Sequence, residues 1–548
     1  MTRREFLPAP MAAAAAAWQA PAPRPNIIFI YADDLDFDEI GCYDITRCPC
    51  VTGAVRGGRF AGGATSRAYS DPRMPTPNIN RLRDEGVQFS RFYVTTAICT
   101  PSRYSVLTGQ YASRSPVFCR KFPHGSQPVI RWDTDLASGQ DNVARVLKKA
   151  GYTTGMVGKW HCGMERGLAL RGIPADADPF DATVNRQISR FYSEGARHVR
   201  ERAGWDYAES LYFSNKEALG LPKAMQVHNL EWIADGAVRF IRQNRGHPYF
   251  LYVPLTVPHL SAAEDGFVAS WLRENPRFTP AGVLDRAPDV MPPRDDIFRR
   301  LREAGIDERN APAAWIDDLV GAVLKAVDET GRAADTLVIF SSDHQSRGKD
   351  TCYESSRVPF VARWPKGIPK ATTTDLLAAN IDLLPTFAEL AGARITSPVD
   401  GRSFAAQLTG RAPAAPWRDS LLLECSNIRA VVTGRWKYVA NRPPGEVWKK
   451  IEEDALEARR TGRKRYVALD GIRNPHPGYV HEGIRYYALD DFPHYFDKDQ
   501  LYDLQADLFE QDNLAGDPSF RSIAGEMQDR LRTLLAPLPH TFGEFKTQ

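Results

Sequence analysis

Short hydrophobic runs alternate with amphipathic stretches along most of the chain. Four continuous apolar runs are typical of strands buried on both faces of a parallel sheet: residues 26–32, 152–157, 249–257 and 336–342. Helical stretches precede the last three runs: residues 142–150, 230–243 and 316–327. Strands that alternate with helices predict an α/β fold, built on a large, mostly parallel sheet flanked by helices.

Polar residues follow each of these runs, at the point where the predicted strand ends. They are Asp33 and Asp34, Lys159 and His161, His259, and Asp343 and His344. Binding sites in open α/β sheets form at the carboxyl ends of the strands. We therefore expect these side chains to meet at one edge of the sheet.

The pattern changes after about residue 410, which indicates a smaller C-terminal α+β subdomain. Three elements are predicted there: a hairpin over residues 429–440, a charged helix over 445–460 and a final helix over 518–535. The chain is expected to divide into an export signal and linker over residues 1–23, a main domain that carries the site over 24–410, and the subdomain over 411–548. A long loop near the site is expected over residues 42–74.

Composition narrows the class of protein. The chain has 548 residues, of which 43% are hydrophobic and 25% charged, as in an ordinary globular protein. Its net charge is +3, so it lacks the strong basic excess that usually marks a nucleic-acid-binding protein. The small net charge does not exclude an anionic small substrate, because the charge around the binding site decides whether it binds. No apolar run reaches the roughly 18 residues of a membrane-spanning helix, and we expect no membrane span.

The first residues resemble an export signal. Arg3-Arg4 is typical of twin-arginine signals, and a short, weakly apolar stretch over residues 11–17 follows it. That stretch is too short to anchor the chain in a bilayer. We therefore expect an exported protein, periplasmic or extracellular, with a disordered tail rich in Ala and Pro as the alternative interpretation.

The run Cys99–Arg103, which reads Cys-Thr-Pro-Ser-Arg, carries the most information about chemistry. Thr100 suits the N-cap of a helix and Pro101 its first position, so a helix is predicted to begin there and to end at Gly109. Cys99 would then lie at the positive end of the helix dipole, where anions bind. From these residues alone, a buried structural cysteine is an equally good interpretation.

The pairs Asp33-Asp34 and Asp343-His344 suggest a metal site. Carboxylates suit a hard divalent cation such as Ca²⁺ or Mg²⁺. Adjacent residues of a strand point to opposite faces, so both can reach one ion only where the strand ends. Solvated loops or helix caps are the alternative for each pair taken singly. His344 is the unusual member, because hard cations prefer oxygen ligands.

The remaining cysteines do not add a second metal site. The chain has eight cysteines, and setting Cys99 aside leaves an odd number. Cys48-Pro49-Cys50 lacks the second pair that a zinc site needs. No disulfide pairing is predicted from the spacing.

Cys99, Pro101 and Arg103 match the fixed positions of a known modification signature. The chain thereby resembles the type I, formylglycine-dependent sulfatases of the alkaline phosphatase superfamily. Four further segments are similar to motifs of that family: Leu107–Tyr111, Gly158–Gly163, Pro254–His259 and Gly348–Glu354. The resemblance runs from residue 24 to the end of the chain and implies an alkaline-phosphatase-like fold. Gln345–Arg347 and Ser355-Ser356 depart from the family's glycine-rich pattern, so the loop there is expected to differ.

The resemblance implies a covalent mechanism. A formylglycine-generating enzyme would oxidise Cys99 to formylglycine, whose hydrate attacks the sulfate and later expels it by returning to the aldehyde. The implied ligands of a divalent ion, calcium in preference to magnesium, are Asp33, Asp34, Asp343, His344 and the modified Cys99. The implied charge-holding residues are Arg103, Lys159 and Lys349. His259 would protonate the leaving oxygen, and His161 would deprotonate the hydrate.

The predicted function is therefore hydrolysis of a sulfate ester. Aromatic and basic residues gather between positions 438 and 499 and could stack on sugars and pair with sulfates, which favours a sulfated carbohydrate as the substrate. An ordinary charged surface would look the same. Two other functions stay open: a phosphonate monoester or phosphodiester hydrolase of the same superfamily, and a protein that binds sulfated glycans without hydrolysing them.

Overall fold

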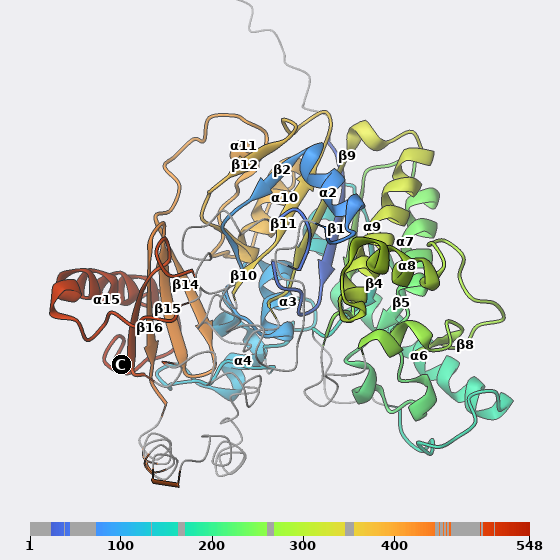
Figure 1. Cartoon of the computed structure of the whole chain (residues 1–548), viewed down its shortest axis with the longest axis horizontal. Helices are drawn as coiled ribbons and strands as arrows, with labels where there is room; N and C mark the ends of the chain where they lie inside the picture. The colour runs from blue at the N-terminus through green and yellow to red at the C-terminus, as the bar shows by residue number, and fades with distance from the viewer. Residues whose placement is uncertain are drawn as a thin grey trace, which may run out of the picture.

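An eight-stranded mixed sheet forms the centre of the molecule (Figure 1). The computed structural model describes residues 24–37, 39–43, 73–132, 134–162, 170–259, 268–345, 356–443, 497–508 and 510–547, with isolated positions between 444 and 496. The strands lie in the order β12 (Thr372–Thr374), β2 (Val87–Phe89), β11 (Phe360–Arg363), β9 (Thr336–Ser342), β1 (Asn26–Ala32), β6 (Tyr249–Pro254), β4 (Thr153–Lys159) and β5 (Tyr207–Tyr212).

The five strands from β9 to β5 are mutually parallel and form the block that carries the site. Strand β11 runs antiparallel to both β9 and β2, and β12 is parallel to β2. Every residue of β1, β6 and β9 is buried, as their continuous apolar sequences predict. The predicted α/β class with a mostly parallel sheet is confirmed.

Helices cover both faces of this sheet. The ring of Tyr249 meets Phe240 of α7 (Leu230–Gln243), whereas its neighbour Phe250 meets Phe387 of α10 (Leu383–Ala391). Because adjacent strand residues point to opposite faces, α7 and α10 lie on opposite sides of the sheet. Helices α2 (Pro77–Asp84) and α9 (Ala311–Glu329) pack with α7, and α3 (Cys99–Thr108) and α5 (Val143–Lys149) pack with α10.

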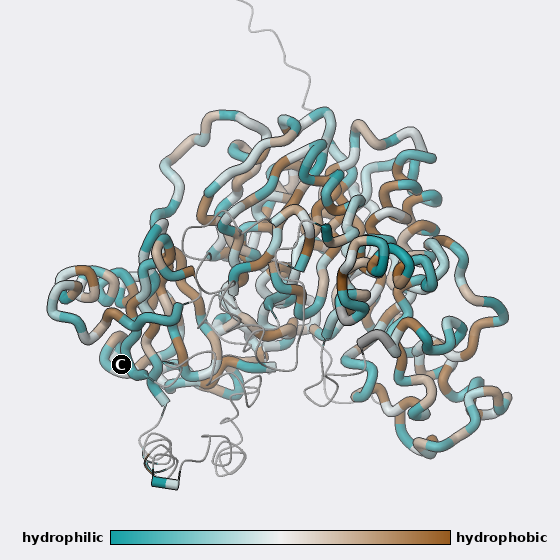
Figure 2. Tube along the Cα trace, viewed as in Figure 1, coloured by the Kyte–Doolittle hydropathy of each residue, from teal (hydrophilic) through white to brown (hydrophobic). Residues whose placement is uncertain are grey.

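Outer helices complete the main domain. They are α4 (Pro116–Lys121), α6 (Ala182–Ala203), α8 (Arg294–Ala304) and α11 (Ala405–Leu408). Hydrophobic stretches of the chain lie mainly in the central strands and the helices against them, and hydrophilic stretches mainly in the outer helices and loops (Figure 2). No helix within the described residues is long and apolar enough to cross a membrane.

A second, four-stranded antiparallel sheet lies beside the main one (Figure 1). Its strands follow chain order: β14 (Ser420–Cys425), β15 (Ile428–Thr433), β16 (Trp436–Asn441) and β17 (Asp499–Asp503). Helix α15 (Arg521–Leu535) packs on this sheet. The predicted hairpin is β15 and β16, and the predicted final helix is α15. The export signal and most of the expected charged helix and 42–74 loop lie outside the described residues.

An ion pair between Arg418 and Asp382 fixes the start of α10. The Asp382 carboxylate is fully buried and also accepts hydrogen bonds from the backbone N–H groups of Ala379, at 2.8 Å, and Arg402, at 2.7 Å. Removing one partner of a buried ion pair leaves an uncompensated charge. The Arg418–Asp382 pair therefore joins the start of α10 to the segment that leads into β14.

Arg418→Met should destabilise the protein by about 3 kcal/mol, because the buried Asp382 carboxylate loses its cation. Urea unfolding measures the change in the free energy of unfolding. Arg411→Met is the matched control, since Arg411 pairs with Glu389 of the same helix at the surface and its loss should change little. Equal effects of the two variants would contradict this account of α10.

Candidate functional site

The carboxyl ends of four adjacent parallel strands meet at one edge of the sheet. Strand β1 leads into Asp33 and Asp34, β9 into Asp343 and His344, β4 into Lys159 and His161, and β6 into the segment that ends at His259. Backbone hydrogen bonds join these ends: Asp33 N–H donates to the Val257 carbonyl at 3.1 Å, and Asp343 N–H to the Ala32 carbonyl at 3.0 Å. The sheet itself therefore assembles the cluster that the strand-end pattern predicts.

Local backbone geometry turns two of these side chains towards the site. Asp34 and His161 have φ angles of 66° and 44°, a left-handed conformation that few residues other than glycine adopt. Gly158, just before Lys159, lies so close to β6 that a Cβ atom there would come within 1.9 Å of the Pro254 carbonyl oxygen. A glycine at position 158 thus lets the ends of β4 and β6 approach each other.

Cys99 enters the site from the first turn of α3. Its side chain is 2% exposed, and its Sγ lies 3.3 Å from His344 Nε2. The predicted N-cap is wrong: the helix begins at Cys99, the N-cap position is Ile98, and no side chain caps the helix. Extended backbone at Ile98 already starts the turn there, so Thr100 and Pro101 lie inside the helix. The predicted end at Gly109 is confirmed by its left-handed φ of 67°.

A buried asparagine holds the turn that carries Cys99. Asn380 Oδ1 accepts hydrogen bonds from the N–H and the hydroxyl of Thr95, at 3.0 and 3.2 Å. Its Nδ2 donates to the carbonyl and the hydroxyl oxygen of Ser102, both at 3.1 Å. The Ser102 hydroxyl also bonds the Tyr31 hydroxyl at 2.8 Å. One amide therefore ties together the chain on both sides of Cys99.

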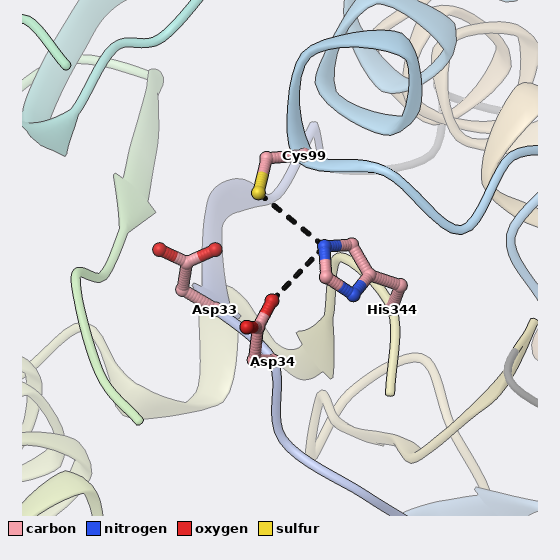
Figure 3. A group of neighbouring side chains, drawn as sticks. All are labelled: Asp33, Asp34, Cys99 and His344. Carbon is pink, nitrogen blue, oxygen red and sulfur yellow. Dashed lines mark hydrogen bonds and ion pairs between the residues drawn. The ribbon is translucent and has the colours of Figure 1, made fainter. Parts of the chain in front are cut away.

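Four of the predicted metal ligands come together. Each of Asp33, Asp34, Cys99 and His344 places a ligand atom within 4.8 Å of the others, and all four are buried (Figure 3). His344 Nε2 points between Cys99 and Asp34, and lies 3.0 Å from Asp34 Oδ1. Asp343 lies at the rim of this group: its Oδ1 is 3.6 Å from His344 Nε2 and accepts the Asp34 N–H at 3.1 Å.

Two buried cations lie against the aspartates. Arg103 is fully buried, with Nη2 at 2.8 Å from Asp343 Oδ2 and 3.3 Å from Asp33 Oδ1. Lys159 Nζ lies 2.5 Å from Asp33 Oδ2. Burial opposes ionisation of Asp33, but Lys159, His259 and Arg103 together outweigh it and hold the pKa of that carboxyl well below its usual range. The bases therefore keep the carboxylate ionised inside the protein.

The acidic groups of this cluster outnumber its permanently basic groups by one. Three acidic groups, Asp33, Asp34 and Asp343, lie against two bases, Arg103 and Lys159, and burial together with the charge of Asp33 raises the pKa of Asp343. Burial disfavours a charged imidazole at His344, but Asp343 and Asp34 outweigh it and raise its pKa to about 10. Both shifts favour a bound proton in this cluster, and a divalent ion among the same oxygens would take its place. The donor set fits such an ion.

The two predicted acid–base residues lie on either side of this cluster. Burial, and then the charge of Lys159, lower the pKa of His161 to about 4, with the neighbouring Cys99 opposing the shift. His161 is therefore a neutral proton acceptor at neutral pH. His259 is half-buried, and its charge lowers the pKa of Asp33. Lys349, the remaining predicted site residue, lies outside the described residues.

The carboxyl end of β5 also reaches the site, and the sequence analysis missed it. Trp160 N–H and His161 N–H donate to the carbonyls of Tyr212 and Phe213, at 2.7 and 3.2 Å. Lys216 and Glu217 follow three and four residues after Phe213. The Tyr212 hydroxyl donates to the Val227 carbonyl at 3.1 Å, which brings the neighbouring His228 close to this strand. The polar run Ser214–Glu217 after the apolar Leu211–Phe213 was the available signal.

Comparisons with known proteins agree with this fold. The sequence pattern of the Sulfatase family matches residues 25–393. The chain is 28% identical to the N-acetylgalactosamine-6-O-sulfatase of Bacteroides thetaiotaomicron, over 78% of this chain and 85% of that protein. It is also 28% identical to human arylsulfatase A, over 77% and 76%. A solved structure of BT4656 in complex with its substrate D-glucosamine-2-N,6-O-disulfate has a TM-score of 0.55 at 17% identity, covering 94% of this chain and 98% of that one.

The fold and the family match together define a sulfuric ester hydrolase. The chain belongs to the sulfatase family, as its strand-end motifs and its cysteine signature predict.

His161 should stay uncharged between about pH 5 and 7.5, because its lowered pKa of about 4 lies below that range. NMR titration of the histidine ring protons measures this directly, with His161→Gln used to assign the resonance. A His161 titration midpoint near 6.5 would mean that burial and Lys159 do not lower the pKa of the ring.

Proposed function

We propose that this protein hydrolyses a sulfate ester of a carbohydrate, with Cys99 acting in its formylglycine form beside a divalent cation. The observation that carries the proposal is the juxtaposition at the sheet edge. Asp33, Asp34 and His344 place ligand atoms within 4.8 Å of the buried Sγ of Cys99, His161 lies beside it, and Arg103 and Lys159 pair with the aspartates. Fixed cations and a metal-binding cluster at one point suit an anionic tetrahedral centre.

The modified cysteine and the cation have distinct parts in this proposal. Formylglycine, when present, supplies a nucleophilic oxygen and a way to release sulfate that a thiol lacks. The cation would be held by Asp33, Asp34, Asp343 and His344, with the residue at position 99, and would polarise sulfate oxygens. Calcium suits the site better than magnesium, because magnesium keeps several waters and demands octahedral geometry, whereas this cluster is fully buried among protein ligands.

The other residues of the site are proposed either to supply positive charge or to transfer protons. Arg103 and Lys159 place fixed positive charge where the sulfate oxygens gather negative charge in the transition state. His161 is neutral and lies beside Cys99, so it can accept a proton from the nucleophile. His259 stands at the end of the neighbouring strand and is proposed to give a proton to the leaving oxygen. Lys349, which follows His344 in the chain, is proposed to add a further positive charge.

A sulfated carbohydrate is the proposed substrate class. The names of two relatives support it: an N-acetylgalactosamine-6-O-sulfatase, and a protein solved with a disulfated glucosamine as its substrate. We also propose that residues 24–410 form the catalytic domain and 411–548 a subdomain. The Arg3-Arg4 segment is proposed to direct export, and a formylglycine-generating enzyme to mature Cys99.

Cys99→Ala should lower kcat/KM for 4-methylumbelliferyl sulfate by about 10⁴ or more, since the nucleophile is removed. Cys119→Ala is the matched control, because Cys119 lies on α4, outside the cluster, and should retain activity. Substantial activity in Cys99→Ala would refute the assigned nucleophile. Hydrolysis of the phosphonate ester of the same leaving group tests the rival function: a large preference for the phosphonate would favour a phosphonate monoester hydrolase.

Ca²⁺ at 100 times Kd should raise the thermal unfolding midpoint by about 2–3 °C, since binding to the folded state then stabilises it by roughly 2–3 kcal/mol. Asp34→Asn should remove most of this shift, because Asp34 is a proposed ligand. Asp235→Asn changes a surface aspartate of α7 paired with Arg239, and should keep the shift. A calcium shift that survives in Asp34→Asn would place the ion elsewhere.

A further inference from the structure

A polar group at the carboxyl end of β5 has no part in the chemistry proposed above. It consists of Lys216, Glu217 and His228, which we call the β5-end group. Lys216 Nζ lies 2.9 Å from Glu217 Oε1, and their side chains are 9% and 44% exposed. The pair therefore presents an accessible carboxylate backed by a nearly buried ammonium.

Hydrogen bonds place this group between the two histidine segments of the site. His161 N–H donates to the Phe213 carbonyl at 3.2 Å, three residues before Lys216. On the other side, His228 Nδ1 bonds the Thr256 hydroxyl at 2.9 Å, and Thr256 precedes His259 on the same segment. The β5-end group therefore lies beside the segment that carries His259, the residue proposed to protonate the leaving oxygen, and the charge of His259 acts on Glu217.

His228 adds a polar atom without a partner. The side chain is 3% exposed, its ring packs on Trp271 with centroids 4.7 Å apart, and Nε2 has no hydrogen-bond partner within the described part of the chain. Burial, followed by the charges of Lys216 and His259, lowers its pKa, so the ring is neutral. A neutral ring in such a place suits a hydroxyl or a bridging water better than a second anion.

The charges of the β5-end group also favour sugar hydroxyls over a second anion. Lys216 and Glu217 cancel each other, whereas Arg103 and Lys159 lie at the reacting centre. A near-neutral Lys–Glu pair offers both a donor and an acceptor, which matches sugar hydroxyls. Although the pair is neutral overall, its exposed member is the Glu217 carboxylate, 44% exposed against 9% for Lys216, so a second sulfate brought beside it would be repelled.

We propose that Lys216, Glu217 and His228 form a subsite that binds hydroxyl groups of the sugar next to the scissile sulfate, and that Glu217 rejects a second sulfate there. The proposal rests on the proposed function and narrows its substrate class to sugars without a second sulfate at this subsite.

Binding measured in a Cys99→Ala background tests the subsite without requiring turnover. By isothermal titration calorimetry, this protein should bind N-acetylgalactosamine 6-sulfate about tenfold more tightly than N-acetylgalactosamine 4,6-disulfate. Adding Glu217→Gln should bring the two affinities within about twofold, since the repelling charge is gone. Glu209→Gln is the matched control: Glu209 is also 44% exposed, lies on β5 and pairs with Arg239. It should keep the tenfold difference.

The results that would overturn the subsite differ from those that would overturn the proposed function. A preference that Glu217→Gln leaves unchanged, tighter binding of the disulfate in Cys99→Ala, or no binding of either sugar overturns the subsite. Binding as expected, with no hydrolysis of either sugar or of 4-methylumbelliferyl sulfate by the protein with Cys99 intact, overturns the proposed function and leaves the subsite standing.

Discussion

The buried carboxylates of Asp33, Asp34 and Asp343 set the constraint on which the rest of the site depends. Charges removed from water are costly unless they are paired and hydrogen-bonded. Arg103 and Lys159 therefore lie within ion-pair distance of two of them, and against the effect of burial the carboxylates raise the pKa of His344. In the proposed function the same arrangement serves the chemistry, because a buried cluster with more acidic groups than bases suits a divalent ion.

The fold meets this constraint through backbone geometry rather than through flexible side chains. Adjacent parallel strands deliver their polar residues to one edge, and backbone hydrogen bonds from Asp33 and Asp343 fix where each pair begins. Asn380 does the same for Cys99 by bonding Thr95 and Ser102 on either side of it. Rigid supports of this kind hold catalytic groups in one geometry.

Much of this could be predicted from sequence where the signal was local. Strands β1 and β9 have the predicted bounds, and the polar residues after four apolar runs do meet, because parallel strands share an edge. The contribution of β5 was missed, since Tyr207–Tyr212 mixes polar and apolar residues and carries no clear strand signal. Asn380 could not be predicted, because its partners lie 285 and 278 residues away. The early start of α3 depends on backbone dihedrals at Ile98, which composition does not reveal.

We propose that Cys99 lies at the reacting centre in an oxidised form. Mass spectrometry of the tryptic peptide Phe92–Arg103, from protein that hydrolyses sulfate esters, tests it most directly. The account predicts the mass of the aldehyde in place of the thiol, and capture of that peptide by a hydrazide. An active preparation in which residue 99 is found wholly as the cysteine thiol would contradict the account.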